Sequence, residues 1–60
     1  LARALQALPI DQRVTLLLVD GQGMKQSEAA AALQVPVGTI GSRLARARSA
    51  MRVALQGGGD

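Results

Sequence analysis

Hydroxyl and guanidinium side chains gather in the run TIGSRLAR, residues 39–46. On a helix, which turns by about 100° per residue, Thr39, Ser42 and Arg46 share one face, and Arg43 flanks it. Short hydroxyl groups form hydrogen bonds with phosphates or base edges, and arginine holds guanine through two hydrogen bonds or neutralises a phosphate. The chemistry of this run is therefore the binding of a polyanion, although arginines on a solvent-exposed helix face are also common in proteins without such a partner.

The net charge of +3 lies entirely in the second half of the chain. Residues 1–30 hold three basic and three acidic residues, whereas residues 31–60 hold four arginines and a single acidic residue, Asp60. A positive field on one side of a protein favours a nucleic acid or an acidic protein as its partner.

The residue types that the chain lacks exclude several kinds of site. It has no cysteine and no histidine, so it has neither a disulfide nor the commonest metal ligand and general base. We therefore expect no metal, no cofactor, no small-molecule ligand and no enzymatic activity. There is neither a signal-peptide pattern nor an apolar run of about 18 residues, so we expect no membrane insertion and a cytoplasmic fragment.

Turn-forming residues divide the chain into four segments of helical length: Leu-Pro at 8–9, DGQG at 20–23 and QVP at 34–36. The apolar spacing predicts a short helix before Pro9, a second helix that starts near Ile10 and is closed by Gly21 and Gly23, and two more over 26–33 and 37–56. Since no strand-like alternation is present, the sequence predicts an all-α, small four-helix domain over residues 1–56, followed by a flexible Gly-rich tail, 57–60.

The last two predicted helices have the sequence shape of a helix-turn-helix, because a three-residue turn joins them. In such a pair the second helix enters the major groove of DNA by its first turns. Alanines 29–32 either let that helix approach closely or simply favour helix formation. The apolar face of the second helix should consist of Val37, Ile40, Leu44, Ala47 and Met51.

A family resemblance covers residues 5–52. The motifs that carry it are the Leu-Pro before a helix ending in Leu-Leu-Leu, the Asp-Gly-x-Gly junction, Ala30, and the specific run Val-Pro-Val-Gly-Thr-Ile-x-Ser-Arg-Leu-x-Arg-Ala-Arg. Together they resemble the C-terminal promoter-binding domain, region 4, of bacterial sigma factors, most closely the extracytoplasmic-function (ECF) group. The resemblance implies that the helix starting near Val37 reads the minus-35 element of promoter DNA. It also implies that the domain docks on the flap of the RNA polymerase β subunit, that an anti-sigma factor can sequester it, and that a separate domain reads the minus-10 element.

The resemblance further implies a set of DNA-facing positions. Thr39 is suited to a phosphate contact near the helix N-terminus, where free backbone N–H groups attract anions. Ser42 and Arg46 are expected to contact base edges, and Arg43 to hold the DNA backbone. Arg48 and Arg52, farther along the helix, are expected to meet solvent or a partner. The positions that match the DNA-facing set are Lys25, Gln26, Thr39, Ser42, Arg43 and Arg46.

Three positions depart from the family pattern. Lys25 stands where a serine or threonine usually caps the helix and cannot accept a hydrogen bond, so that helix start should be looser unless Ser27 caps a helix beginning later. Gln26 stands at an often aromatic position. Gly41 replaces the usual lysine or arginine, in a helix interior where glycine costs about 0.5–1 kcal/mol relative to alanine. Either the missing side chain lets DNA or a partner helix approach closely, or the well-anchored helix simply tolerates the glycine.

Three other functions remain open at this point. A response-regulator-type helix-turn-helix shares the four-helix plan, although the Leu-Pro and Gly-Thr-Ile-x-Ser-Arg-Leu motifs favour the sigma factor. A protein-interaction module could bind an anti-sigma factor or polymerase without reading DNA itself. A basic helix on a membrane surface fits less well, because the apolar face lacks Trp and Phe.

Overall fold

The computed structural model describes residues 2–57, which contain four α-helices, one turn of π-helix and no strand. The elements are α1 (Ala2–Ala7), α2 (Ile10–Leu16), the π-helical turn η1 (Leu17–Gly21), α3 (Gln26–Leu33) and α4 (Val37–Gly57). The all-α prediction is confirmed. Helix α4 includes Gly57, which the prediction assigned to the tail, and residues 58–60 of that tail lie outside the described residues.

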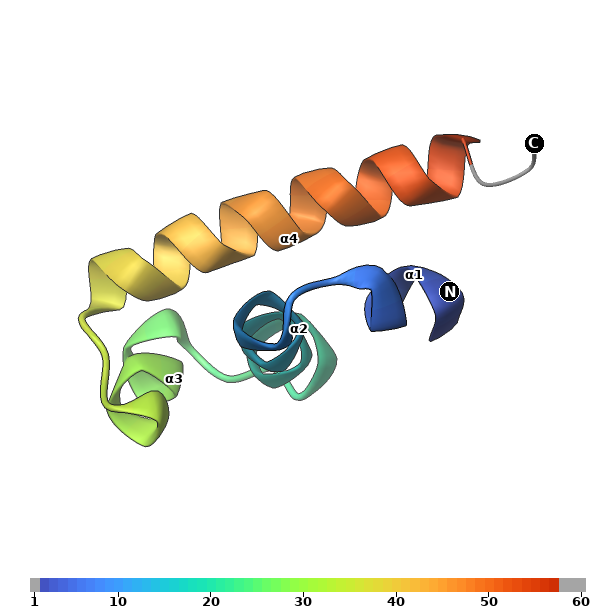
Figure 1. Cartoon of the computed structure of the whole chain (residues 1–60). Coiled ribbons are helices and arrows are strands. Elements are labelled where there is room, and N and C mark those ends of the chain that lie inside the picture. Colours follow the sequence, from blue (N-terminus) through green and yellow to red (C-terminus); the bar gives the residue numbers. More distant parts are fainter. Residues whose placement is uncertain (1, 58–60) are drawn as a thin grey trace.

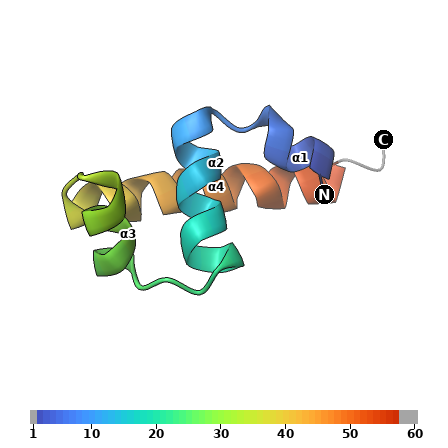
Figure 2. The same ribbon diagram turned by 90° about the horizontal axis from the view of Figure 1, so that it is seen from below.

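Helix α4 runs along the whole domain, and the other three helices follow one another along one side of it (Figure 1). Seen from below, α2 crosses α4 near its middle, with α3 and α1 to either side (Figure 2). The longest dimension of the domain is 38 Å, and a 21-residue helix is about 31 Å long, so α4 alone nearly sets that length.

Pro9 separates α1 from α2, as the sequence predicts. Its φ of −54° and ψ of 149° are extended, it forms the N-cap of α2, and the preceding Leu8 is buried. Proline disfavours the helical conformation at the residue before it, so α1 ends at Ala7. Asp11 lies in the first turn of α2, where a helix favours a negative side chain.

The end of α2 differs from the prediction. Instead of stopping, the helix widens into η1, where the Gln22 N–H donates to the Leu17 carbonyl at 2.9 Å. The chain then turns at Gly23, whose φ of 77° is in the left-handed region that glycine adopts without strain. Gly23 is therefore the residue that closes the helix, whereas Gly21 is part of the wide turn.

The three-residue turn between α3 and α4 lies at 34–36, as predicted. Gln34 is left-handed, with φ 59° and ψ 46°, and two backbone hydrogen bonds close the end of α3. The Val35 N–H donates to the Ala30 carbonyl at 3.0 Å and the Gln34 N–H to the Ala31 carbonyl at 3.3 Å, which is the Schellman pattern. Glycine usually occupies this position, so glutamine holds the turn at a conformational cost.

The hydrophobic core joins α4 to the other helices. Ile40, Leu44 and Ala47 are at most 1% exposed and pack with Leu8, Leu16, Ala29 and Ala30. The predicted apolar face of α4 is thus confirmed at its centre, and half-buried Met51 extends it. It is wrong at Val37, which is 53% exposed at the start of the helix. Of the four alanines, Ala29 and Ala30 are buried, because only one side of α3 faces the core.

Candidate nucleic-acid interface

The first turns of α4 present a polar surface because the core fixes the rotation of the helix. With Ile40 and Leu44 buried, the opposite side of the helix faces outward. Ser42 and Arg46 are exposed there, and Thr39 is half-buried near the helix N-terminus. The Thr39 N–H is taken by the Pro36 carbonyl at 3.0 Å, so its hydroxyl rather than its amide is the group available to a ligand. The predicted face is therefore the solvent-facing side of α4.

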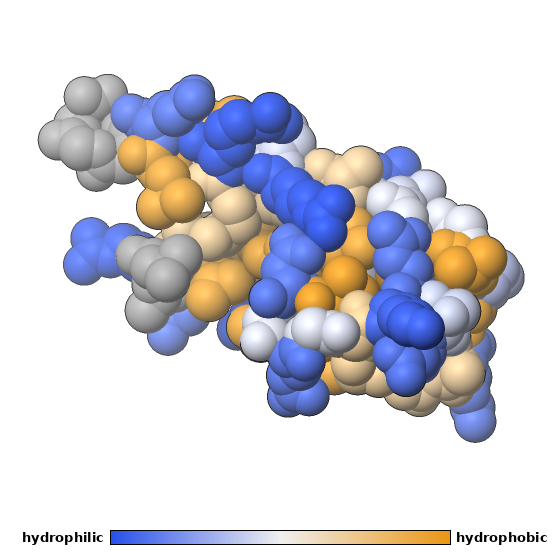
Figure 3. All heavy atoms as spheres, turned by 180° about the vertical axis from the view of Figure 1, so that it is seen from behind, coloured by the Kyte–Doolittle hydropathy of each residue, from blue (hydrophilic) through white to orange (hydrophobic). Residues whose placement is uncertain are grey.

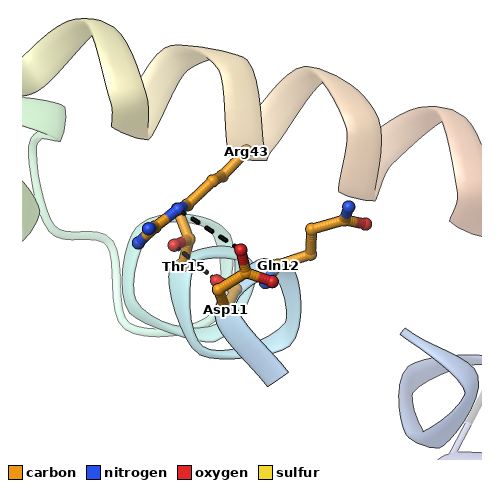
Figure 4. A network of polar contacts seen from close by, with 4 residues as sticks. All are labelled: Asp11, Gln12, Thr15 and Arg43. Atoms are coloured by element: carbon orange, nitrogen blue, oxygen red, sulfur yellow. Dashed lines mark hydrogen bonds and ion pairs between the residues drawn. The ribbon is translucent and has the colours of Figure 1, made fainter. Parts of the chain in front are cut away.

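Arg43 lies to one side of this face and has a partner that the sequence analysis missed. Its Nε is 3.6 Å from Oδ2 of Asp11 on α2, and its side chain is only 26% exposed (Figure 4). This contact joins residues far apart in the chain, so helical spacing alone could not reveal it. The one available signal was an acidic residue in the first turn of α2.

Lys25 and Gln26 lie at the start of α3, where both are exposed. Lys25 is the N-cap residue, with an extended backbone, and its N–H donates to Glu28 Oε1 at 2.8 Å. Because the lysine side chain has no acceptor, this is the half of a capping box that Glu28 alone can provide. The alternative in which Ser27 caps a later helix start is wrong, since Ser27 lies within α3.

Gln26 also approaches α4. A Cβ added at Gly41 would lie 3.7 Å from Gln26 Oε1, which is an ordinary van der Waals distance, and would meet no other side chain nearby. The structure thus brings together Gln26 and Gly41, two positions that depart from the family pattern. No close approach of another helix within the described residues requires the glycine.

Arg48 makes a two-pronged ion pair with Asp20 in η1. Its Nε donates to Oδ2 at 2.9 Å and its Nη2 to Oδ1 at 2.6 Å. These hydrogen bonds lower the pKa of Asp20, against a partly opposing effect of burial, and the carboxylate raises the pKa of Arg48. The prediction that Arg48 meets solvent or a partner overlooked this contact, because it depends on the π-helical turn that positions Asp20.

Apolar side chains reach the surface at the other end of the domain, between α1 and the C-terminal part of α4 (Figure 3). An open groove of about 670 Å³ lies there, bordered by η1 as well as by α1 and α4, and its apolar lining includes Leu5, Leu17, Met51 and Leu55. Leu17 and Leu55 are 44% and 58% exposed. The polar surface at the start of α4 and this apolar groove are thus separate features.

Within residues 2–57, no three His, Cys, Asp or Glu side chains lie together in a way that could hold a metal ion. None of the helices described there combines the length and the apolar character needed to cross a membrane.

Comparison with known proteins shows the family of this chain. The family model described as "Sigma-70, region 4" matches residues 1–51. The RNA polymerase sigma-H factor of Pseudomonas aeruginosa is 43% identical over 54 residues, which are 90% of this chain and 28% of that protein. The ECF RNA polymerase sigma factor SigM of Mycobacterium tuberculosis is 47% identical over 47 residues, 78% of this chain and 24% of its own length. The ECF RNA polymerase sigma-E factor of Salmonella typhimurium is 41% identical over 49 residues, 82% of this chain and 26% of that protein.

The chain thus spans about a quarter of the length of these relatives. The matched region contains all of α1, α2 and α3 and the buried part of α4, so the family match covers the hydrophobic core of the domain. This removes the response-regulator alternative, and sigma factors are transcription factors rather than enzymes. With the family match over most of its length and these relatives beside it, the chain belongs to the sigma-70 region 4 family.

Proposed function

We propose that this domain binds the minus-35 element of promoters, as the region 4 part of an ECF sigma factor that directs RNA polymerase to initiate transcription. The observation that carries the proposal is the exposure of Ser42 and Arg46 on the first turns of α4. Their orientation is fixed by the burial of Ile40 and Leu44 beneath them. A recognition helix needs this combination, because its first turns must fit the major groove while its other face stays packed.

Each polar side chain has a proposed role. Ser42 and Arg46 contact base edges, since they lie at the centre of the exposed face, and Thr39 binds a phosphate through its hydroxyl. Arg43 holds the DNA backbone from the side of this face. Lys25 and Gln26, at the start of α3, contact the backbone beside the groove.

The partners proposed from the family are the flap of the RNA polymerase β subunit and an anti-sigma factor, within the bacterial cytoplasm. The apolar groove between α1 and α4 supports a protein-docking role alongside DNA binding, because exposed apolar surface of this kind favours protein partners. A domain that served only in such docking would show no preference among DNA sequences.

Fluorescence anisotropy with labelled DNA tests the proposal. The label belongs on the duplex, because the chain has no Trp, Tyr or Phe. Binding is measured on a pool of randomised duplexes and on duplexes selected from it, at two salt concentrations, for the wild type and for Arg46→Ala. Arg52→Ala is the matched control, since it removes the same charge from an exposed position farther along α4.

We expect the wild type to prefer some sequences at both salt concentrations. A two-pronged contact between arginine and guanine is worth about 1–3 kcal/mol of discrimination, so Arg46→Ala should reduce the preference for the selected sequence by about 5- to 150-fold. Arg52→Ala should weaken binding to all DNA sequences by the same factor. Wild-type binding that is equal for every sequence and fades with salt would refute promoter reading by this domain.

A further inference from the structure

Asp11 places a negative charge beside the proposed DNA-binding surface. Among the described residues, Arg43 is the one member of the predicted DNA-facing set that forms an ion pair, and Asp11 is its partner. Such a carboxylate is unexpected at a surface proposed to bind phosphates, because like charges repel. The carboxylate should therefore change how strongly this surface binds DNA.

The position of Asp11 is fixed by its own helix. The Gln12 N–H donates to Asp11 Oδ1 at 2.9 Å, and the hydroxyl of fully buried Thr15 donates to the Asp11 carbonyl oxygen at 2.8 Å. With Oδ1 occupied in this way, Oδ2 faces the Nε of Arg43 (Figure 4). The carboxylate is thus held in place, and the flexible arginine side chain is drawn to it.

The contact is loose enough to be exchanged for another anion. At 3.6 Å it is longer than a hydrogen bond, and the Asp11 side chain is 52% exposed. A phosphate that approaches Arg43 must compete with a charge already present. The carboxylate offsets part of the Arg43 charge, so the pair neutralises less of a phosphate charge than a free arginine and releases fewer of the counterions bound to the DNA.

We propose that Asp11 is an affinity-determining residue for DNA: it restrains Arg43 and reduces the contribution of that arginine to phosphate binding. The inference rests on the proposed function, because it concerns how strongly the same surface binds DNA. It assigns a role in DNA binding to α2, which lies outside the helix-turn-helix.

The test is a double-mutant cycle on one duplex of arbitrary sequence, measured by anisotropy between about 50 and about 200 mM salt. The variants are Asp11→Asn, Arg43→Ala and the two combined. Asp20→Asn is the matched control, because it removes the same charge from the ion pair with Arg48, which is outside the DNA-facing set. Far-UV circular dichroism checks that each variant is folded, and Asp11→Ser replaces Asp11→Asn if the latter is not.

We expect Asp11→Asn to bind about 1.5- to 5-fold tighter at the lower salt, the range that corresponds to an exposed ion pair. Its salt dependence should be steeper, by up to about 0.9 in log K against log salt, which is one phosphate contact. In the Arg43→Ala background the same change should have little effect. Asp20→Asn should give a smaller gain than Asp11→Asn.

Three results would overturn the inference. An equal gain in affinity with and without Arg43, or an equal gain from Asp20→Asn, would mean that net charge alone is responsible. No gain from Asp11→Asn would mean that the pair does not limit binding. Each of these results leaves the proposed function intact if the wild type binds DNA. Failure of every variant to bind DNA, the wild type included, would refute the proposed function and this inference together.

Discussion

Replacing Gly41 with lysine should change both the stability of the domain and its binding to DNA. The structure has room for the side chain, since an added Cβ meets only Gln26 Oε1 at 3.7 Å. Removing a glycine from a helix interior stabilises the fold by about 0.5–1 kcal/mol. For a domain of this size that corresponds to a rise in melting temperature of roughly 2–8 °C.

Comparing Gly41→Lys with Gly41→Ala separates the effect of the added charge from the effect of helix propensity. Gly41→Ala gains the propensity without the charge, so both variants should melt at higher temperature than the wild type. Only Gly41→Lys should bind non-specific DNA more tightly. One added phosphate contact steepens the salt dependence by about 0.9, so its advantage should fall by about 3.5-fold between 50 and 200 mM salt.

Thermal unfolding followed by far-UV circular dichroism and anisotropy with labelled duplexes measure the two effects. If Gly41→Lys bound DNA like Gly41→Ala at every salt concentration, position 41 would not face the DNA backbone. If Gly41→Ala instead lowered the melting temperature, the contact with Gln26 would be tighter than the distance indicates, and the glycine would be needed for packing.

Two further predictions concern stability. Gln34→Gly should stabilise the domain by about 1 kcal/mol, because glycine adopts the left-handed conformation of this turn without strain, and a urea midpoint no higher than that of Gln34→Ala would contradict this. The pKa of Asp20 is lower in the folded than in the unfolded chain, because of its ion pair with Arg48. The ion pair therefore stabilises the fold at pH values above the unfolded pKa of about 3.9, and this stabilisation is lost as the pH falls through the folded pKa. Asp20→Asn should therefore lower the urea midpoint near neutral pH, and the midpoint of this variant should fall less steeply than that of the wild type as the pH is lowered. If the midpoint of the variant depended on pH as that of the wild type does, the ion pair would not stabilise the fold in this way.

Much of the fold could be predicted from the sequence because its signals are local. Pro9 acts on its own neighbours, and apolar spacing is a property of one helix, so α3, the turn at 34–36 and the start of α4 were predicted correctly. The π-helical turn η1 was not, since nothing in the run LLVDG distinguishes a wide turn from an ordinary helix end. Val37 fits the helical spacing but lies beyond the edge of the core.

For the candidate site, the sequence predicted the direction of side chains better than their partners. The exposure of Ser42 and Arg46 follows from the helical period once Ile40 and Leu44 are assigned to the core. The ion pairs of Arg43 and Arg48 depend on how α2 crosses α4, a tertiary arrangement that no local pattern encodes. The DNA contacts themselves remain predictions.

The uneven packing of α4 has a consequence for how its backbone opens. Its buried side chains lie between Ile40 and Ala47, whereas Val53 and Leu55 are 66% and 58% exposed. Amide protons around Leu44 should therefore exchange with solvent only when the whole domain unfolds, while those beyond Met51 should exchange through fraying of the last turns. A protein that covered Val53 and Leu55 would slow exchange there, so amide protection along this single helix would report where such a partner ends.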